Sequence, residues 1–183
     1  MEFNSMNGGT RMFHSWKIIF LIMLSALLLT ACGQSLEDRT AKGLKSAEEA
    51  FYANNKVGTE EVEGVKLYKP MGFTIKEDSD AQNILFTKND DTFILFINPN
   101  EEVNSRLFYD LLLEDETKET VAIETFIEDR TFGFVAVMAS DSNQVELIAS
   151  VGGAKITTLT KEKNIDTHLR TMMEIVRSIN KKE

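Results

Sequence analysis

The chain has few of the residues on which disulfide bonding, zinc binding and nucleophilic catalysis depend. Its 183 residues include one cysteine, two histidines, two prolines and one tryptophan. A single cysteine cannot form a disulfide within one copy, so the hydrophobic core must hold the fold. Zinc sites and Cys/His nucleophile pairs need more such ligands, and no Gly-x-Ser-x-Gly segment presents a serine. We therefore expect a domain without metal, cofactor, disulfide or catalytic activity.

Positive charge is also scarce. The chain has 20 Lys and Arg against 29 Asp and Glu, a formal net charge of −9 at pH 7. Subtracting Arg11, Lys17 and Glu2, which lie in the segment assigned below to a leader, leaves 18 basic and 28 acidic residues and a charge of −10. Such a chain repels phosphate backbones, which argues against nucleic acid as a partner. It also argues against a polybasic contact with anionic lipid.

Long apolar runs are missing except near the N-terminus. Residues 18–29 are largely apolar but fall short of the ~20 residues that span a bilayer. The basic Lys17 precedes this run, and the small residue Ala31 ends it before Cys32. These features predict a secretory signal peptide. Residues 1–11 are typical of an upstream extension, and Met12 is the better start.

The run Leu29-Thr30-Ala31-Cys32 resembles the lipobox of bacterial lipoproteins. The resemblance implies that residues 1–31 are a leader and signal peptide and that Cys32 becomes the lipidated first residue. It places the protein on the extracytoplasmic face of the cell membrane, where two acyl chains suffice for stable anchoring. Three alternatives stay open: an uncleaved membrane anchor, a core helix, and an ordinary signal peptide whose cysteine is incidental.

The chain after residue 31 divides into a short N-terminal part, 32–64, and a single domain, 65–183. Within the first part, residues 35–54 have helical spacing, and an acidic link follows at 56–64. The apolar stripe of this helix is thin and rich in small residues. We interpret it as a helix that packs loosely or acts as a spacer from the membrane.

The single domain shows many strand patterns and two further helices. Tight turns containing Asn, Asp or Gly separate the strands and predict mostly antiparallel pairing. The expected strands are 65–69, 73–76, 83–87, 92–98, 120–127, 132–138, 145–151 and 155–159, the first two forming a hairpin. Helices are expected over 103–113 and 164–180.

The apolar patterns also predict how these elements are layered. The segment 93–97 is apolar on both faces, which favours an α+β fold with helices on both faces of a mostly antiparallel sheet. Residues Leu169, Met172 and Val176 of the last helix should face this sheet, and Arg170 and Arg177 should lie on the surface.

The element order resembles that of the PsbP-like superfamily, which includes lipoproteins of the LpqN type. The segment Tyr68-Lys69-Pro70-Met71-Gly72-Phe73 is similar to the Tyr-x-Pro-x-Gly-Phe-like opening hairpin of that group. The resemblance covers residues 65–180 and implies a PsbP-like sandwich. It also implies an accessory or binding protein, because most members are of that kind, and it transfers no functional residue.

Candidate chemical sites are few. The histidine of the mature chain, His168, is expected to be a partly exposed helix residue without a catalytic role. Asn89-Asp90-Asp91 and Asp141-Ser142-Asn143 offer oxygen ligands, but they lack the spacing of a calcium loop. We interpret both as hairpin turns. The adjacent carboxylates of Glu101-Glu102 and Glu114-Asp115-Glu116 indicate solvated edges.

One apolar surface exceeds what the fold needs. Apolar residues cover more than half of the circumference of helix 103–113, whereas a helix that packs on one face needs a narrower apolar stripe. The excess either packs under a loop or forms a partner-binding patch at Leu107, Phe108 and Leu111.

The leading hypothesis is a lipid-anchored accessory or binding protein without catalysis. Its partner would be a membrane or cell-wall protein, and it would face a Gram-positive wall or, as an open alternative, a Gram-negative periplasm. The alternatives are a small-ligand or signal-sensing lipoprotein with a pocket between sheet and helix, and a hydrolase with a carboxylate site. A flat apolar surface would favour the first, a deep apolar pocket the second, and clustered buried carboxylates the third.

Overall fold

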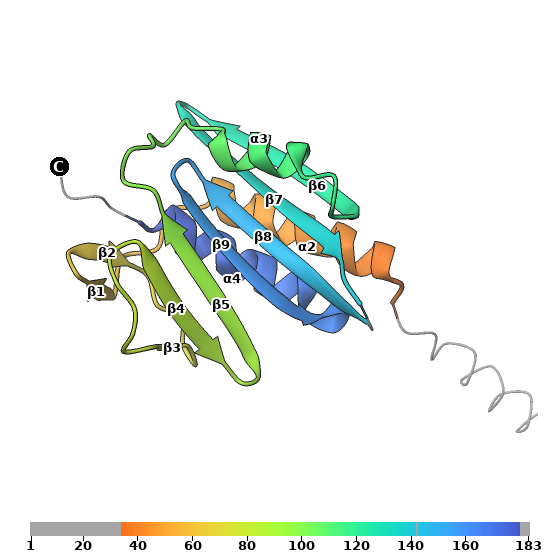
Figure 1. The fold of residues 1–183 in the computed structure, drawn as a ribbon, viewed down its shortest axis with the longest axis horizontal. Helices are drawn as coiled ribbons and strands as arrows, with labels where there is room; N and C mark the ends of the chain where they lie inside the picture. Colours follow the sequence, from red (N-terminus) through yellow and green to blue (C-terminus); the bar gives the residue numbers. More distant parts are fainter. Residues whose placement is uncertain (1–33, 142, 180–183) are drawn as a thin grey trace, which may run out of the picture. The chain divides into compact units, whose positions relative to one another are not determined.

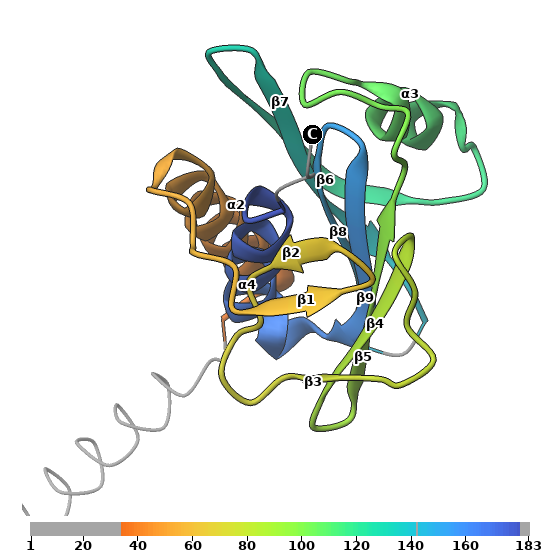
Figure 2. The same cartoon turned by 90° about the vertical axis from the view of Figure 1, so that its left-hand side faces the viewer.

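A computed structural model describes residues 34–141 and 143–179. At its centre is a seven-stranded sheet with the order β3-β4-β5-β9-β8-β7-β6, in which every neighbouring pair is antiparallel. Helices lie on both faces of this sheet (Figure 1; Figure 2), which confirms the expected fold class. The strands are β3 (Thr74–Ile75), β4 (Asn83–Lys88), β5 (Asp91–Ile97), β6 (Thr120–Glu128), β7 (Thr131–Ala139), β8 (Gln144–Val151) and β9 (Ala154–Lys161).

The hairpin turns of the sheet occur where short polar or glycine segments predict them. Asn89, Asp129, Asn143 and Gly152 all have φ between 50° and 60° in these turns. Asn, Asp and Gly tolerate this left-handed region better than other residues do. The four hairpins β4–β5, β6–β7, β7–β8 and β8–β9 are therefore encoded locally.

The expected hairpin between segments 65–69 and 73–76 is wrong. The first of these segments pairs instead with a strand in the acidic link, so that β1 (Glu60–Val62) and β2 (Val65–Leu67) form a separate two-stranded sheet. Glu63 and Gly64 both have positive φ, 44° and 88°, as a type I′ turn requires, and this turn suits the twist of a two-residue hairpin. The second segment forms β3, which pairs with β4. Only the turn at 70–73 survives from the quoted motif, closed by Phe73 N–H donating to the Pro70 carbonyl at 3.1 Å.

The N-terminal helix belongs to the domain. The compact unit begins at Leu36, so the segment 36–64 is part of it and the domain does not start at 65. Helix α2 (Leu36–Tyr52) runs beside α4 (Ile165–Arg177), with Thr40 and Gly43 buried between them. A Cβ atom on Gly43 would lie 2.7 Å from Cγ2 of Ile165. The small residues thus permit a close helix contact, and the interpretation as a loosely packed spacer is wrong.

The two helices on this face cover the main core. Leu169, Met172 and Val176 of α4 are buried against the sheet as expected, and the short 3-10 helix η1 (Glu162–Asn164) leads into α4. Arg177, expected on the surface, is only 11% exposed in its side chain. Its Nη2 lies 2.6 Å from Oε2 of Glu128 and its guanidinium carbon 4.6 Å from the centre of the Phe51 ring. The aromatic ring and the carboxylate together make this burial of a cation tolerable.

The opposite face carries one short helix, α3 (Leu107–Glu114), on the other side of the sheet from α2 and α4 (Figure 2). This helix begins later than expected because residues 98–106 form a strap across the strand ends. Within the strap, the Val103 carbonyl accepts a hydrogen bond from Phe132 N–H at 2.9 Å. A second core cluster lies beneath the helix and contains Phe108, Phe132, Phe134, Ala136, Met138 and Ile148.

Candidate functional site

The predicted lipidation site, Cys32, lies outside the described residues, as does the apolar run before it. In the part of the chain that the structure describes, no helix combines the length and apolar character needed to cross a membrane. Helix α2 begins at Leu36, four positions after Cys32.

The three residues of the predicted partner patch have different surroundings. Phe108 is 7% exposed and belongs to the core under α3, with its ring centre 5.8 Å from that of Phe96. Leu107 is half-buried. Leu111 is 53% exposed. Only Leu111 therefore offers a largely accessible apolar side chain, and the surface next to it determines whether a patch exists.

That neighbouring surface is the part of the sheet that α3 leaves uncovered. Ile94 of β5 is 48% exposed and Leu159 of β9 is 50% exposed. Ile94 points to the same side as Phe96, since side chains two apart in a strand share a face. Figure 1 shows β5, β9 and β8 unobstructed, with α2 and α4 behind them. We call this surface the open face. A shallow cavity of about 610 Å³ lies along it. The residues of the open face that line this cavity are Thr92, Ile94, Gln144, Glu146, Thr157 and Leu159.

A narrower cavity of about 180 Å³ joins α3 to the open face, with which it shares Glu146 and Thr157. Lys155 lines it, with Nζ 5.1 Å from the centre of the Phe108 ring. Burial lowers the pKa of Lys155, and the charge of Lys118 lowers it further, whereas Glu146 acts in the opposite direction. Lys118 itself pairs with Glu146 at 2.6 Å. Among the described residues, Lys155 has no ion-pair partner of its own.

The expectation of a partly exposed His168 is wrong. Its side chain is 6% exposed, and Nε2 lies 2.9 Å from Oδ2 of Asp91. The Phe93 ring centre is 5.0 Å from that of the imidazole. A sequence signal existed, because His168 lies three residues after Ile165 and four before Met172, on the buried stripe of α4. The hydrogen bond connects β5 to α4, between residues 77 positions apart.

This His–Asp pair lacks the third member of a nucleophilic triad. In the described part of the chain, Nδ1 of His168 is buried and has no hydrogen-bond partner. A serine or threonine nucleophile would donate its hydroxyl proton to the free ring nitrogen. Asp91 is instead contacted by Asn164, whose Nδ2 lies 3.3 Å from Oδ2. The arrangement is that of a structural connection.

The stability of the protein should decrease when His168 becomes protonated. Burial lowers the pKa of His168 below its ordinary 6.5, and Lys88 lowers it further, while Asp91 opposes both. Below pH 6.5 the unfolded chain therefore binds more protons than the folded chain. The contribution of neutral His168 to the free energy of unfolding is complete at pH values above the pKa that this residue has in the unfolded chain. It is lost as the pH falls toward the pKa of His168 in the folded chain. Urea unfolding of the domain between pH 7.5 and about 5 should show this decline, since carboxylates titrate mostly lower.

The matched variant for this prediction is His168→Gln, which can still donate a hydrogen bond to Asp91 but does not titrate. Its free energy of unfolding should change less over the same pH interval. An equal slope in parent and variant would show that His168 is not the group responsible.

The described residues of the two Asx segments lie at hairpin turns, as expected, and Asp91 opens β5. Asn89 closes β4–β5 and Asn143 lies between β7 and β8, with φ of 52° and 60°. Asp91 is engaged with His168. Within residues 34–141 and 143–179, no group of three or more His, Cys, Asp or Glu side chains is placed to hold a metal ion.

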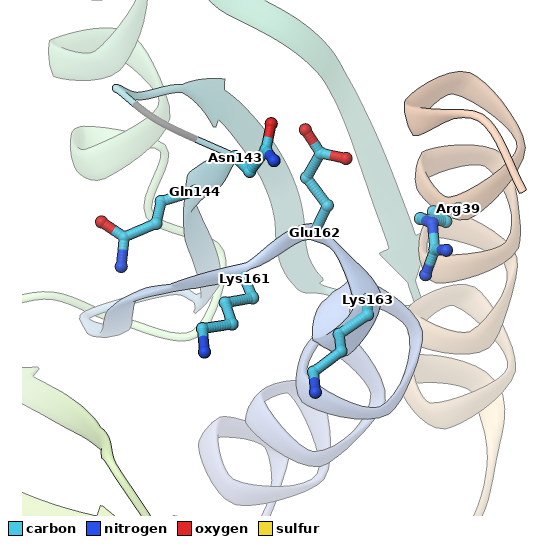
Figure 3. A pocket seen from close by; sticks show the side chains of 6 residues that line it. All are labelled: Arg39, Asn143, Gln144, Lys161, Glu162 and Lys163. Carbon is cyan, nitrogen blue, oxygen red and sulfur yellow. The ribbon is translucent and has the colours of Figure 1, made fainter. Parts of the chain in front are cut away.

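A cavity of about 640 Å³ lies beside the first turns of α2 and the end of β9 (Figure 3). Figure 3 shows Lys161 and Lys163 pointing to one side, while the carboxylate of Glu162 lies on the other side, near Asn143. Its polar groups do not converge on one point, as they do in sites that fix a ligand. Arg39 and Gln144 complete the lining.

A further cavity of about 580 Å³ lies between the end of α4 and the β8–β9 turn. Val151, Val176 and Ile179 form an apolar part of its wall. The strap contributes Glu101 and Glu102. This cavity lies between sheet and helix, where the small-ligand hypothesis places a pocket, and its lining mixes apolar and charged groups.

No protein-family model and no curated protein sequence matches the chain. Among solved structures, the solution structure of cyanobacterial PsbP (CyanoP) from Synechocystis sp. PCC 6803 is similar, with 14% sequence identity and a TM-score of 0.38. The match covers 70% of this chain and 98% of that one.

Proposed function

We propose that the protein is a lipid-anchored, extracytoplasmic accessory protein that binds a membrane or cell-wall protein and does not catalyse a reaction. The observation that carries the binding function is the open face, where Ile94 and Leu159 are about half exposed and lie near the exposed Leu111. Exposed apolar side chains grouped among polar ones, as these are, are typical of interaction sites. The buried His168–Asp91 pair, which lacks a nucleophile, supports the absence of catalysis.

The anchor is supported by the lipobox-like run that ends at Cys32. Cys32→Ala should abolish incorporation of an alkyne-labelled fatty acid in growing cells, because the chain has no other thiol to alkylate. The variant should accumulate as precursor or appear in the medium. Ser35→Ala, three residues away, should label like the parent. Label on the Cys32→Ala protein would refute the anchor.

Photo-crosslinking in intact cells tests the binding function. A benzoylphenylalanine at Ile94 or Leu159 should form an adduct with another protein, because both side chains reach solvent from the open face. Met71, which is 95% exposed in the turn before β3, is the control position. The proposed function fails if the open-face positions give no protein adduct, or no more than Met71 does.

A second candidate function is small-ligand or signal sensing through the cavity between α4 and the β8–β9 turn. Its volume of about 580 Å³ lies in the range of ligand pockets. Filling it with Val151→Phe should abolish such a function and leave crosslinking from Leu159 unchanged. That pair of results would favour the pocket over the open face, whereas a Val151→Phe protein with unchanged function would refute the pocket.

A further inference from the structure

The two edges of the seven-stranded sheet differ in length. One edge strand is β3, which has two residues, and the other is β6, which has nine. Proteins commonly protect an edge strand by keeping it short or by placing lysine or proline in it. Strand β6 contains neither residue, and Figure 2 shows the end of the β6–β7 hairpin projecting beyond α2 and α3. Of the two edges, β6 is therefore the one at which another strand can pair.

The backbone groups of Ile123, Thr125 and Ile127 point away from the sheet. Ile127 lies opposite Phe132 of β7, but the N–H and carbonyl of Phe132 bond to the strap and to the β8–β9 turn. This pair is therefore of the non-hydrogen-bonded kind, so the N–H and carbonyl of Ile127 face outward. The Tyr52 hydroxyl, which donates to the Ile127 carbonyl at 3.4 Å, agrees with this orientation. Thr125 and Ile123 have the same orientation, because the two pair types alternate along an antiparallel ladder.

These outward groups specify the kind of segment that fits the edge. Apart from the contact with Tyr52, they have no hydrogen-bond partner among the described residues. The Ile127 carbonyl can accept a second hydrogen bond, since its oxygen has two lone pairs. A row of alternating N–H and carbonyl groups is matched by an added β-strand. The occupant of this edge is therefore an extended segment.

The sequence of β6 fits a second copy of itself. The ladder with β7 is regular over residues 122–128, after a register shift between residues 120 and 122, and Thr125 is the midpoint of the regular stretch. Antiparallel pairing of two copies about Thr125 places Ile123 of each copy opposite Ile127 of the other. Ile127 is 64% exposed in the single chain, and an apolar cross-strand pair would cover it.

The acidic residues of β6 favour the same register. With Thr125 at the centre, Glu124 lies opposite Phe126 of the second copy. Glu128 then lies opposite Ala122. Moving the centre to residue 124 would place Glu124 opposite its own copy, and moving it to residue 126 would place Glu124 opposite Glu128. Like charges directly opposite each other destabilise a strand pair, so both neighbouring registers are disfavoured.

We infer that two copies of the protein pair through β6, antiparallel and centred on Thr125, to form one continuous sheet. The inference does not depend on the proposed binding function. The open face, on β5, β9 and β8, is separated from β6 by β7, so it stays accessible in the pair. The two-fold axis is perpendicular to the shared sheet, so both open faces lie on the same side. Seven paired residues from each copy make a small interface of the transient class, for which covalent trapping is the suitable measurement.

Disulfide trapping in intact cells tests the register. Thr125→Cys should give a disulfide-linked dimer on mild oxidation, because residues at the centre of the pair have Cα atoms about 5.5 Å apart. Ile127→Cys alone should give about tenfold less, since the two copies of residue 127 lie four positions apart along the strands, about 14 Å. Coexpression of Ile123→Cys and Ile127→Cys chains with different tags should restore the dimer. The parent, whose one cysteine is Cys32, and Met71→Cys, at a position 95% exposed, measure the background.

A backbone substitution tests the hydrogen bonds of the edge. Ile127→Pro in the Thr125→Cys chain removes an outward N–H and leaves the ladder with β7 intact. The dimer yield should fall about tenfold with this proline, whereas Ile127→Leu should keep it. Urea midpoints equal to that of the Thr125→Cys chain would show that both variants fold. If the proline variant unfolds, the pattern of the cysteine variants decides alone.

Three results would overturn the inference. The first is a dimer yield from Thr125→Cys no higher than that from Met71→Cys. The second is a yield from Ile127→Cys alone that equals that from Thr125→Cys, because it would show contact without the register. The third is a disulfide from Thr125→Cys to a different protein and not to this chain. Crosslinking from Leu159 remains the test of the proposed function, so either proposal can fail while the other stands.

Discussion

Leu169→Ala should lower the free energy of unfolding by about 2–5 kcal/mol, the range for large-to-small changes in a core. The Leu169 side chain is 0% exposed. Its Cδ1 would lie 3.1 Å from a Cβ atom built on Gly43, so the leucine fills the close contact between α2 and α4. Because that contact is tight on both sides, we expect the cavity left by the removed side chain to collapse little. The decrease in the free energy of unfolding should therefore be large.

Arg170→Ala is the matched control, one position along the same helix. Its side chain is 52% exposed, and its ion-pair distances to Glu49 and Glu174 are 3.8 and 3.7 Å. Exposed pairs of this kind contribute little, so the change should stay within about 0.5 kcal/mol. Urea unfolding of both variants provides the comparison. A Leu169→Ala protein that unfolds at the parent's midpoint would show that the stripe does not face the core.

The elements predicted correctly depend on local sequence. The β-hairpins could be identified because Asn89, Asp129, Asn143 and Gly152 tolerate the left-handed conformation that their turns adopt. The apolar stripe of α4 could also be predicted from the sequence, since its apolar residues recur with the helical period. The β1–β2 hairpin was missed because Glu63-Gly64 is a weaker turn signal than Asn-Gly and lies in an acidic segment.

The features that could not be predicted depend on contacts between distant segments. Gly43 weakens an isolated helix, and only the position of Ile165 explains why it is needed. The pairing of His168 with Asp91 likewise depends on the packing of α4 across β8 and β9, which brings His168 to the start of β5. The open face is a similar case: segment 93–97 is apolar on both sides, which predicted two covered faces, yet α3 is too short to reach Ile94.

The strap that holds α3 in place provides the second large effect. Gly152, in the β8–β9 turn, has φ +50° and lies against the strap backbone; a Cβ atom there would lie 2.6 Å from Cα of Val103 and still closer to the Glu102 carbonyl oxygen. These are main-chain atoms, so the overlap with an added Cβ atom can be removed only if the strap moves. Gly72 also has positive φ, +82°, but nothing lies within 4 Å of a Cβ atom built on it. The two glycines therefore separate backbone strain from steric conflict.

Gly72→Ala should cost about 1–2 kcal/mol, the penalty of the left-handed region for a residue with a Cβ atom. Gly152→Ala should cost that amount and about 1–3 kcal/mol more, as overpacking does. Urea unfolding gives both values. Hydrogen exchange at the Phe132 amide, which donates to the Val103 carbonyl at 2.9 Å, reports on the strap directly and should accelerate only in Gly152→Ala. If the two alanine variants unfold alike and the Phe132 amide stays protected in both, the strap does not press on the turn. The position of α3 beside the open face would then need another cause.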